Sequence, residues 1–251
     1  MLKMLQGTSC LIAAGLALAS LATAGEMVSY PSGPETASGY LAAPDGAGKK
    51  PGIVVIQEWW GLSAFEKGKA DYFAKQGYVA LAVDLYRGKV TEDPDVAHQL
   101  MRGMPEDRAI RDLKAAVAYL RSRPDVEGSR IGSVGWCMGG GYSLALAFAE
   151  PSLSGAVVYY GRLVTDPAAI QSLKVPLLGN FGAKDEGIPA ASVREFEATA
   201  KNLGKSVDFK IYPDAGHGFA SSRDPKVYRR DDAKGADART DAFFARVLTG
   251  K

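Results

Sequence analysis

The sequence predicts an α/β fold in which a mostly parallel central sheet is covered by helices on both faces. Two observations support this class. Short apolar runs alternate along the chain with longer stretches of helical period, and several of the apolar runs lack polar alternation. Strands that are buried on both faces have this continuous apolar character, and parallel strands need crossover connections, which are usually helices.

The expected elements can be placed in order along the chain. Strands are predicted at residues 52–56, 78–83, 130–134, 156–159, 175–178 and 207–211. Helices are predicted at residues 62–76, 110–120, 138–149, 190–202 and 237–248, where apolar residues recur at three- and four-residue spacing. Gly77 and Gly204 are expected as left-handed helix terminators. The densely charged stretch 224–241 is interpreted as a solvated surface.

The first 24 residues are predicted to be a secretory signal peptide. Residues 1–7 carry one lysine and no acid, residues 10–21 are almost continuously apolar, and residues 22–24, Ala-Thr-Ala, supply a small-residue cleavage pattern. A membrane anchor is the alternative, but the apolar run is shorter than the roughly 20 residues that span a bilayer. We therefore expect a periplasmic or secreted protein in which residues 25–251 form a single domain.

Charge and cysteine content narrow the function of the mature chain. Lys3 is the only charged residue of the leader, so cleavage lowers the formal charge from +2 to +1, which predicts no strong attraction to nucleic acid or anionic membranes. Cleavage also removes Cys10 and leaves Cys137 as the only cysteine. Exported proteins usually pair their cysteines or avoid them, because a lone thiol is open to oxidation. An inert buried thiol is the alternative for Cys137.

The sequence around Cys137 favours a reactive thiol. Residues 135–140, Gly-Trp-Cys-Met-Gly-Gly, follow an expected strand and open an expected helix, which is the pattern of a nucleophile elbow with cysteine in place of serine. This pattern predicts the α/β-hydrolase form of the fold. The sharp turn forces the central residue toward strained backbone angles, and Gly135 and Gly139 permit close approach of the neighbouring chain. The sulfur would lie near the positive end of the helix, where a thiolate is favoured.

An acid and a histidine are expected after the nucleophile, each in a loop that follows a later strand. Asp185 and His217 occupy such positions. The other histidine, His98, precedes the elbow and is expected on the surface. The alternatives are a structural core histidine for His217 and an ordinary turn residue for Asp185.

These residue types suit acyl transfer. A thiolate attacks a carbonyl, an imidazole moves the proton, and a carboxylate fixes the imidazole tautomer. The backbone N–H of Met138 is expected to hold the resulting oxyanion, together with a donor from the loop after the first central strand, where residues 57–61 read Gln-Glu-Trp-Trp-Gly. No histidine or cysteine spacing suits a metal, so no metal and no cofactor are expected.

Five motifs together point to one family. They are residues 57–61, residues 84–86 (Asp-Leu-Tyr), residues 135–140, residues 159–161 (Tyr-Tyr-Gly) and residues 215–219 (Ala-Gly-His-Gly-Phe). In combination they resemble the dienelactone hydrolases, also called carboxymethylenebutenolidases, over nearly all of the mature chain.

The resemblance implies roles for two further residues. The acid that matches Glu58 lies near the resting thiol and helps to generate the thiolate when substrate arrives, and the N–H of Trp59 completes the oxyanion hole. A carboxylate beside a thiol disfavours ionisation of the thiol, so a switch coupled to substrate binding is physically reasonable. The alternative for Glu58 is a structural carboxylate hydrogen-bonded to backbone.

One departure from the family concerns substrate binding. The resemblance implies two arginines that bind a carboxylate of the substrate, and Arg87 matches the first. At the second position, four residues after His217, this sequence has Ser221, and the nearest arginine is Arg223. Because of this mismatch, the sequence does not decide whether the substrate is the lactone of the family. The aromatic residues expected to line the substrate pocket, with packing as the alternative role, are Trp60, Tyr86 and Tyr160.

The sequence therefore predicts hydrolysis of an ester or lactone through a thioester at Cys137. Two alternatives stay open: another acyl hydrolase, such as a thioesterase or small-ester esterase, and a non-catalytic thiol sensor or binder. The expected partner is a small-molecule ester or lactone. We expect no nucleic acid, no stable membrane anchor after leader cleavage, and a monomer, with a dimer as the alternative.

Overall fold

A computed structural model describes residues 25–250, so the predicted leader lies outside the described residues. Within this range, eight strands form one sheet in the order β1-β2-β4-β3-β5-β6-β7-β8. The pairs β1–β2 and β2–β4 are antiparallel. All other neighbouring pairs are parallel. The mostly parallel sheet predicted from the sequence is confirmed, and the fold is that of an α/β-hydrolase.

The elements have the following bounds. The strands are β1 (Glu26–Ser32), β2 (Glu35–Ala42), β3 (Lys50–Ile56), β4 (Val79–Asp84), β5 (Val126–Trp136), β6 (Gly155–Tyr159), β7 (Leu177–Gly182) and β8 (Val207–Tyr212). The helices are α1 (Ala64–Lys75), α2 (Pro94–Arg102), α3 (Glu106–Ser122), α4 (Met138–Ala149), α5 (Pro167–Ser172), α6 (Ala190–Asn202) and α7 (Arg230–Phe244), which continues into the π-helical turn η1 (Ala245–Thr249).

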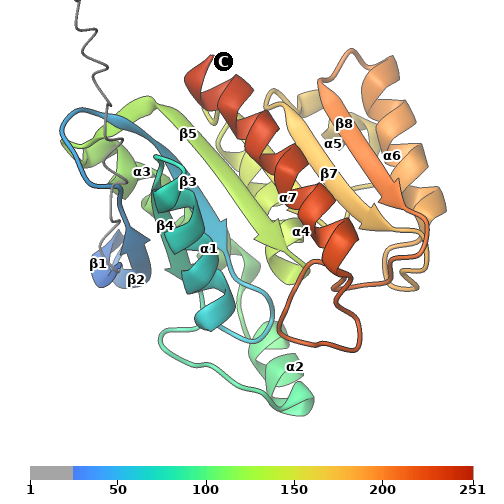
Figure 1. The fold of residues 1–251 in the computed structure, drawn as a ribbon, viewed down its shortest axis with the longest axis horizontal. Coiled ribbons are helices and arrows are strands. Elements are labelled where there is room, and N and C mark those ends of the chain that lie inside the picture. The colour runs from blue at the N-terminus through green and yellow to red at the C-terminus, as the bar shows by residue number, and fades with distance from the viewer. Residues whose placement is uncertain (1–24, 251) are drawn as a thin grey trace, which may run out of the picture.

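Helices cover both faces of the sheet, as predicted. Figure 1 shows α1 and α7 in front of the strands, and α3 and α4 behind them. Alternate residues of β3 enter the two resulting cores: Val54 and Ile56 join the side of α3, and Ile53 and Val55 join the side of α1. Successive side chains of a strand point to opposite faces, so burial on both faces explains why this strand has no polar alternation.

All six strands and five helices predicted from the sequence are present, but with shifted bounds, and the hairpin β1–β2 and the helices α2 and α5 were missed. The hairpin β1–β2 at the sheet edge contains Ser, Thr, Gly and Glu and buries only some of its residues, so it lacks the apolar run of a central strand. Helix α2 buries only Ala97. The short α5 was also missed. Gly77 and Gly204 have φ of 95° and 71°, which confirms them as left-handed positions after α1 and α6.

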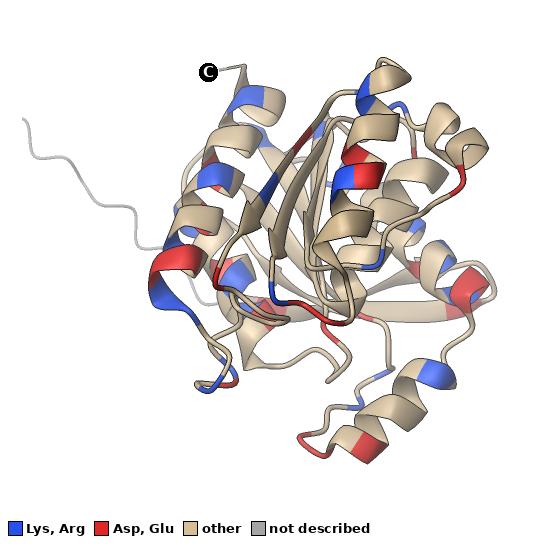
Figure 2. Cartoon of the chain, turned by 90° about the vertical axis from the view of Figure 1, so that its right-hand side faces the viewer, with Lys and Arg blue, Asp and Glu red and all other residues tan. Residues whose placement is uncertain are grey.

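The sheet gathers its loops at one edge. The parallel strands β3 to β8 end on the same side, so the loops that follow them meet there, which is where open α/β sheets place their ligand sites. Helix α2 projects beyond the body of the molecule at this end (Figure 2).

Acidic and basic residues are interspersed over the outer helices, in keeping with a formal charge of +2. Within residues 25–250, no helix has both the length and the apolar character needed to cross a membrane.

Candidate active site

Cys137 lies on a strained turn between β5 and α4. Its φ of 54° and ψ of −119° are unusual for a residue with a side chain. Close packing around the turn explains its glycines. A Cβ on Gly135 would lie 2.0 Å from the carbonyl oxygen of Gly139, and a Cβ on Gly139 would lie 2.3 Å from that of Ile56. The predicted elbow is therefore present, and Cys137 is only partly buried at its apex.

The structure brings the three predicted side chains of the triad into one chain of contacts. The Nε2 atom of His217 lies 3.1 Å from Cys137 Sγ, and its Nδ1 atom lies 2.8 Å from Asp185 Oδ2. The other oxygen of Asp185 accepts the N–H groups of Gly187 and Ile188, both at 2.9 Å. The carboxylate is thus fixed by its own loop, while the His217 side chain remains 43% exposed.

The environment of the pair favours a protonated imidazole. Burial alone would lower the pKa of His217, but its hydrogen bonds to Asp185 and Cys137 raise the pKa to about 10. Burial alone would also raise the pKa of Asp185, whereas the hydrogen bond from His217 and those from the backbone lower it below its usual value. An imidazolium in contact with the sulfur stabilises negative charge there, which is the condition a thiol nucleophile requires.

Glu58 is a buried carboxylate at the same end of the sheet. It is 4% exposed and accepts a hydrogen bond of 3.0 Å from the hydroxyl of Ser221. Burial and the nearby carboxylate of Glu66 raise the pKa of Glu58 to about 7, although Ser221, His217 and Arg223 oppose the shift. Glu58 can therefore gain or lose a proton near neutral pH. Ser221, noticed in the sequence only as a mismatch, is its hydrogen-bond partner.

Glu66 holds the loop that carries Glu58 and Trp59. Its buried carboxylate accepts the N–H of Glu58 at 3.0 Å and the N–H of Ser63 at 2.9 Å. Ser63 caps helix α1 in return, so the two residues form a capping box. This residue was missed, but the Ser-x-x-Glu spacing at positions 63–66 was a usable signal. The clamp fixes the loop that carries the Trp59 N–H, the second expected oxyanion donor, while the Met138 N–H lies in the unpaired first turn of α4.

Three aromatic residues expected around the substrate have defined neighbours. The hydroxyl of Tyr86 contacts the sulfur of Met138 at 3.2 Å. The ring of Tyr160 packs edge-on against His217, with ring centroids 5.2 Å apart. The ring of Trp60 packs against that of Trp59. All three therefore contact residues of the site or its loops, although Tyr160 is fully buried. Their role in substrate binding stays a prediction.

The two arginines considered for substrate binding already have partners. Arg87 pairs with Glu35 at 2.9 Å and with the buried Asp112 at 2.7 Å. The structure thus commits its guanidinium to carboxylates at the start of β2 and in α3. Arg223 lies over the ring of Trp60, 4.7 Å from its centroid, and donates to the carbonyl of Thr91 at 3.0 Å.

His98 is exposed on α2, as expected for a surface residue. It is nevertheless close to the site, because its ring packs against Trp59 with centroids 4.7 Å apart. The amide of Thr91, which leads into α2, also donates to the carbonyl of Trp60 at 2.9 Å. These contacts connect α2 to the loop after β3, a relationship that the sequence did not indicate because α2 itself was not predicted.

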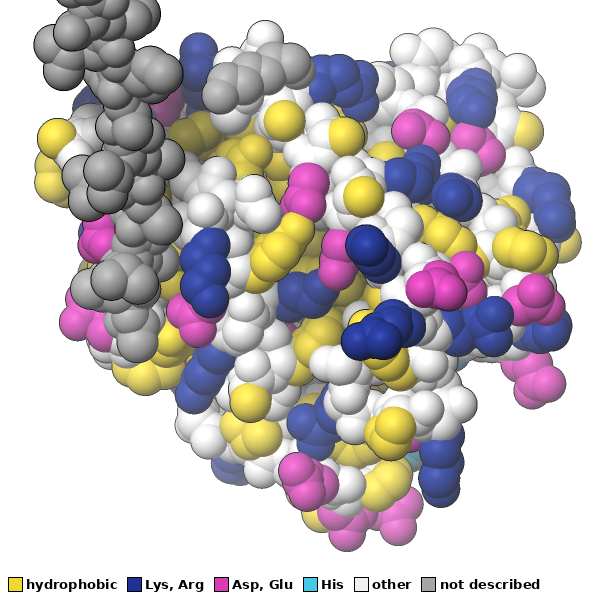
Figure 3. Space-filling model, in the orientation of Figure 1, with side chains coloured by type: hydrophobic (Ala, Val, Ile, Leu, Met, Phe, Trp, Pro, Cys, Tyr) yellow, Lys and Arg dark blue, Asp and Glu magenta, His cyan; other side chains and the backbone are white. Residues whose placement is uncertain are grey.

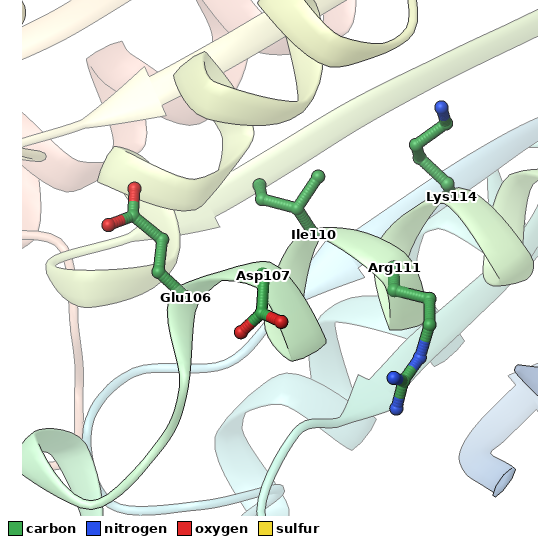
Figure 4. Close-up of a pocket in the computed structure, with 5 residues that line it drawn as sticks. All are labelled: Glu106, Asp107, Ile110, Arg111 and Lys114. Carbon is green, nitrogen blue, oxygen red and sulfur yellow. The ribbon is translucent and has the colours of Figure 1, made fainter. Parts of the chain in front are cut away.

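Away from this cluster, a hollow of about 490 Å³ lies on α3 and is lined by Glu106, Asp107, Ile110, Arg111 and Lys114. Figure 4 shows these side chains projecting from one helix without converging on a common point. Within residues 25–250, no three His, Cys, Asp or Glu side chains are grouped so as to hold a metal ion.

The chain is similar in sequence to a known protein family and to several of its relatives. The sequence profile described as "Dienelactone hydrolase family" matches residues 37–248. A protein of Methylorubrum extorquens named "Putative carboxymethylenebutenolidase" is 33% identical over 219 residues, which cover 82% of this chain and 75% of that protein. "Protein usf" of Aquifex pyrophilus is 33% identical over 232 residues, covering 90% of this chain and 100% of that protein.

Solved structures show the same likeness. The crystal structure described as "Putative Dienelactone Hydrolase" from Klebsiella pneumoniae superposes with a TM-score of 0.81 at 27% sequence identity. The match covers 88% of this chain and 98% of that one. The likeness therefore extends over most of the described fold.

Proposed function

The chain belongs to the dienelactone hydrolase family, a class of carboxylic ester hydrolases, and from this we propose that it cleaves an ester or lactone with Cys137 as nucleophile. One observation carries the proposal: the chain of contacts from Cys137 Sγ through His217 to Asp185, at 3.1 Å and 2.8 Å. This is the order of nucleophile, base and orienting acid that acyl transfer requires.

The proposed reaction has two halves. The thiolate of Cys137 attacks the carbonyl carbon, and the N–H groups of Met138 and Trp59 hold the oxyanion. The C–O bond of the ester then breaks, the imidazolium of His217 gives its proton to the departing alkoxide, and a thioester remains on Cys137. In the second half, His217 takes a proton from water, the resulting hydroxide attacks the thioester, and the carboxylic acid leaves as the sulfur is restored.

Glu58 is proposed to control when the thiolate forms. Its carboxylate is buried, its pKa is raised to about 7, and its hydrogen-bond partner is the neutral Ser221. Burial of this kind makes a negative charge on Glu58 costly, so the group exchanges a proton readily near neutral pH. Such a group can accept the thiol proton when substrate changes its surroundings.

A chromogenic ester tests the proposed function. Wild-type protein should hydrolyse 4-nitrophenyl acetate, and Cys137→Ala should lose activity to the level of the uncatalysed reaction. Ser129→Ala, a change at an exposed residue at the other end of β5, serves as the control and should keep full activity. Equal hydrolysis by wild type and Cys137→Ala would contradict the proposal.

We also propose that the protein is exported. The support is the sequence of residues 1–24, with one lysine, an apolar run and the Ala-Thr-Ala pattern. Mass spectrometry of protein recovered from the periplasm or the medium should find a mature chain that begins at Gly25. A full-length chain retained in the cytoplasm would contradict this.

A further inference from the structure

We infer, on the basis of the proposed function, that this site selects uncharged esters with an extended apolar acyl group and discriminates against esters that carry a carboxylate. Two features of the site around Cys137 determine this substrate class: the partners that the neighbouring arginines already have, and the apolar side chains at the edge of the site.

The arginines near the site are occupied. The Arg87 guanidinium lies between the carboxylates of Glu35 and Asp112, and Asp112 is fully buried. An anionic substrate would have to draw Arg87 away from the buried carboxylate of Asp112, which would keep the hydroxyl of Ser32 and the more distant Arg111 as partners. Breaking a buried ion pair in this way is strongly unfavourable. Arg223 is held by the Trp60 ring and the Thr91 carbonyl, and the carboxylate of Glu92 lies 3.9 Å from it.

Of the groups that remain at the site, the protonated His217 is already paired with Asp185 and Cys137, and Glu58 does not favour an anion. Glu58 is buried there, and its direct partner is the uncharged hydroxyl of Ser221. Whenever Glu58 is charged, a substrate carboxylate would meet a like charge in surroundings where solvent screens it little. Arg223 lies close enough to Glu58 to stabilise its charge, so its own positive charge is already partly compensated.

Exposed apolar side chains lie among charged ones at the edge of the site. Among the described residues, five large hydrophobic side chains are exposed, and four of them lie in two segments beside the site. We name these four the apolar rim: Val90, Val96, Val227 and Tyr228. The fifth, Met27, lies on the edge strand β1. Figure 3 shows hydrophobic side chains among charged ones at the lower end of the molecule, over α2.

Contacts connect the rim to the site. A Cβ on Gly218, which follows His217, would lie 3.4 Å from a methyl group of Val227. A Cβ on Gly61, which follows Trp60, would lie 3.0 Å from the Cα of Val90. The hydrogen bond from Arg223 to the Thr91 carbonyl joins the two segments. An acyl chain long enough to reach either segment would bury apolar surface of the rim, and such burial favours a longer chain by up to about fourfold per methylene.

Three esters that share one leaving group distinguish the effect of the charge of the acyl group on cleavage from the effect of its size. They are 4-nitrophenyl hexanoate, the 4-nitrophenyl monoester of adipic acid, whose terminal methyl is replaced by a carboxylate, and the methyl ester of that monoester, which is neutral. We expect kcat/KM for the two neutral esters to exceed that for the charged one by at least about tenfold, because a charge in an uncompensated site is costly to desolvate. Equal or faster cleavage of the charged monoester would overturn the inference.

Variants of the rim test the apolar contribution. Val227→Ser and Tyr228→Ser should lower the ratio of hexanoate to acetate cleavage, whereas Met27→Ser, a change at a more exposed hydrophobic residue away from the site, should leave the ratio unchanged. An unchanged ratio in both rim variants would overturn the role of the rim. If no ester is cleaved, acetate included, the proposed function itself fails; if acetate is cleaved without a preference for neutral chains, only the inference fails.

Discussion

The hydroxyl of Ser221 donates a hydrogen bond of 3.0 Å to the buried carboxylate of Glu58. The two residues are far apart in the chain, one directly after β3 and the other in the loop after β8, and both are less than 6% exposed. Ser221 stands where the family resemblance implies a substrate-binding arginine. In this protein, the position therefore supplies a neutral hydrogen-bond donor to the acid that is proposed to control the thiol.

Loss of this donor should move the pH dependence of activity. The Ser221 hydroxyl favours the charged form of Glu58, so Ser221→Ala should raise the pKa of Glu58 above its value of about 7. The limb of the kcat/KM profile that reports Glu58 should shift to higher pH, measured between pH 5 and 9 with a neutral ester. Ser222→Ala, at the exposed neighbouring serine, should give the wild-type profile. An unshifted limb in Ser221→Ala would argue that Glu58 does not govern activity.

Glu58 should also make stability depend on pH. Its pKa rises from the usual 4.5 to about 7 on folding, so the folded protein binds more protons than the unfolded chain between these values. Glu58 therefore makes a contribution to the free energy of unfolding that is fully present below about pH 4.5. This contribution, on the order of 3 kcal/mol, is lost as pH rises to about 7 and beyond. Urea unfolding at pH 5 and pH 8 should show this loss, and Glu58→Gln should reduce it. The same pH dependence in both proteins would contradict the assignment.

Removal of the charge on Asp185 should disable the imidazole. Asp185→Asn keeps the size of the side chain but no longer fixes the His217 tautomer, and kcat should fall by about 10³- to 10⁴-fold, as it does in serine triads. Asp214→Asn is a matched control, because Asp214 forms an exposed ion pair with Lys184 in the next loop. Circular dichroism should show that both variants are folded. A kcat for Asp185→Asn within tenfold of wild type would be inconsistent with the triad.

The Glu66 clamp should matter more for the transition state than for substrate binding. Glu66→Gln weakens the hydrogen bonds that hold the loop of Trp59, so kcat should fall by about tenfold or more while KM changes little. Glu195→Gln, on an exposed position of α6, should change neither constant. If KM rises and kcat stays constant, the loop binds the ground state and Trp59 is not an oxyanion donor.

Elements of the fold and of the site could be predicted where the local sequence pattern directly reflects how the segment is packed in the folded protein. The central strands are continuously apolar because both faces are buried, and the elbow around Cys137 needs glycines that no other residue can replace. Asp185 and His217 were found because the order of a triad along an α/β sheet is restricted. Their convergence on Cys137 follows from parallel strands that end at one edge.

Other features depended on contacts that have no local signature. The β1–β2 hairpin intersperses Ser, Thr, Gly and Glu with its buried apolar residues, and α2 buries only Ala97, so neither contains the long apolar run of the central elements. The partners of Arg87 come from the start of β2 and from α3, and the partner of Glu58 comes from the loop after β8. These pairings join segments that are distant in sequence, and a single sequence does not reveal which polar residues meet.

The identity of the nucleophile is tested most directly by the site of acylation. Protein mixed with a slowly hydrolysed 4-nitrophenyl ester, quenched in acid within the first turnover and digested, should carry the acyl group as a thioester on the peptide that contains Cys137. Hydroxylamine should release it. An acyl group on another residue, or undiminished turnover by Cys137→Ala, would contradict the account.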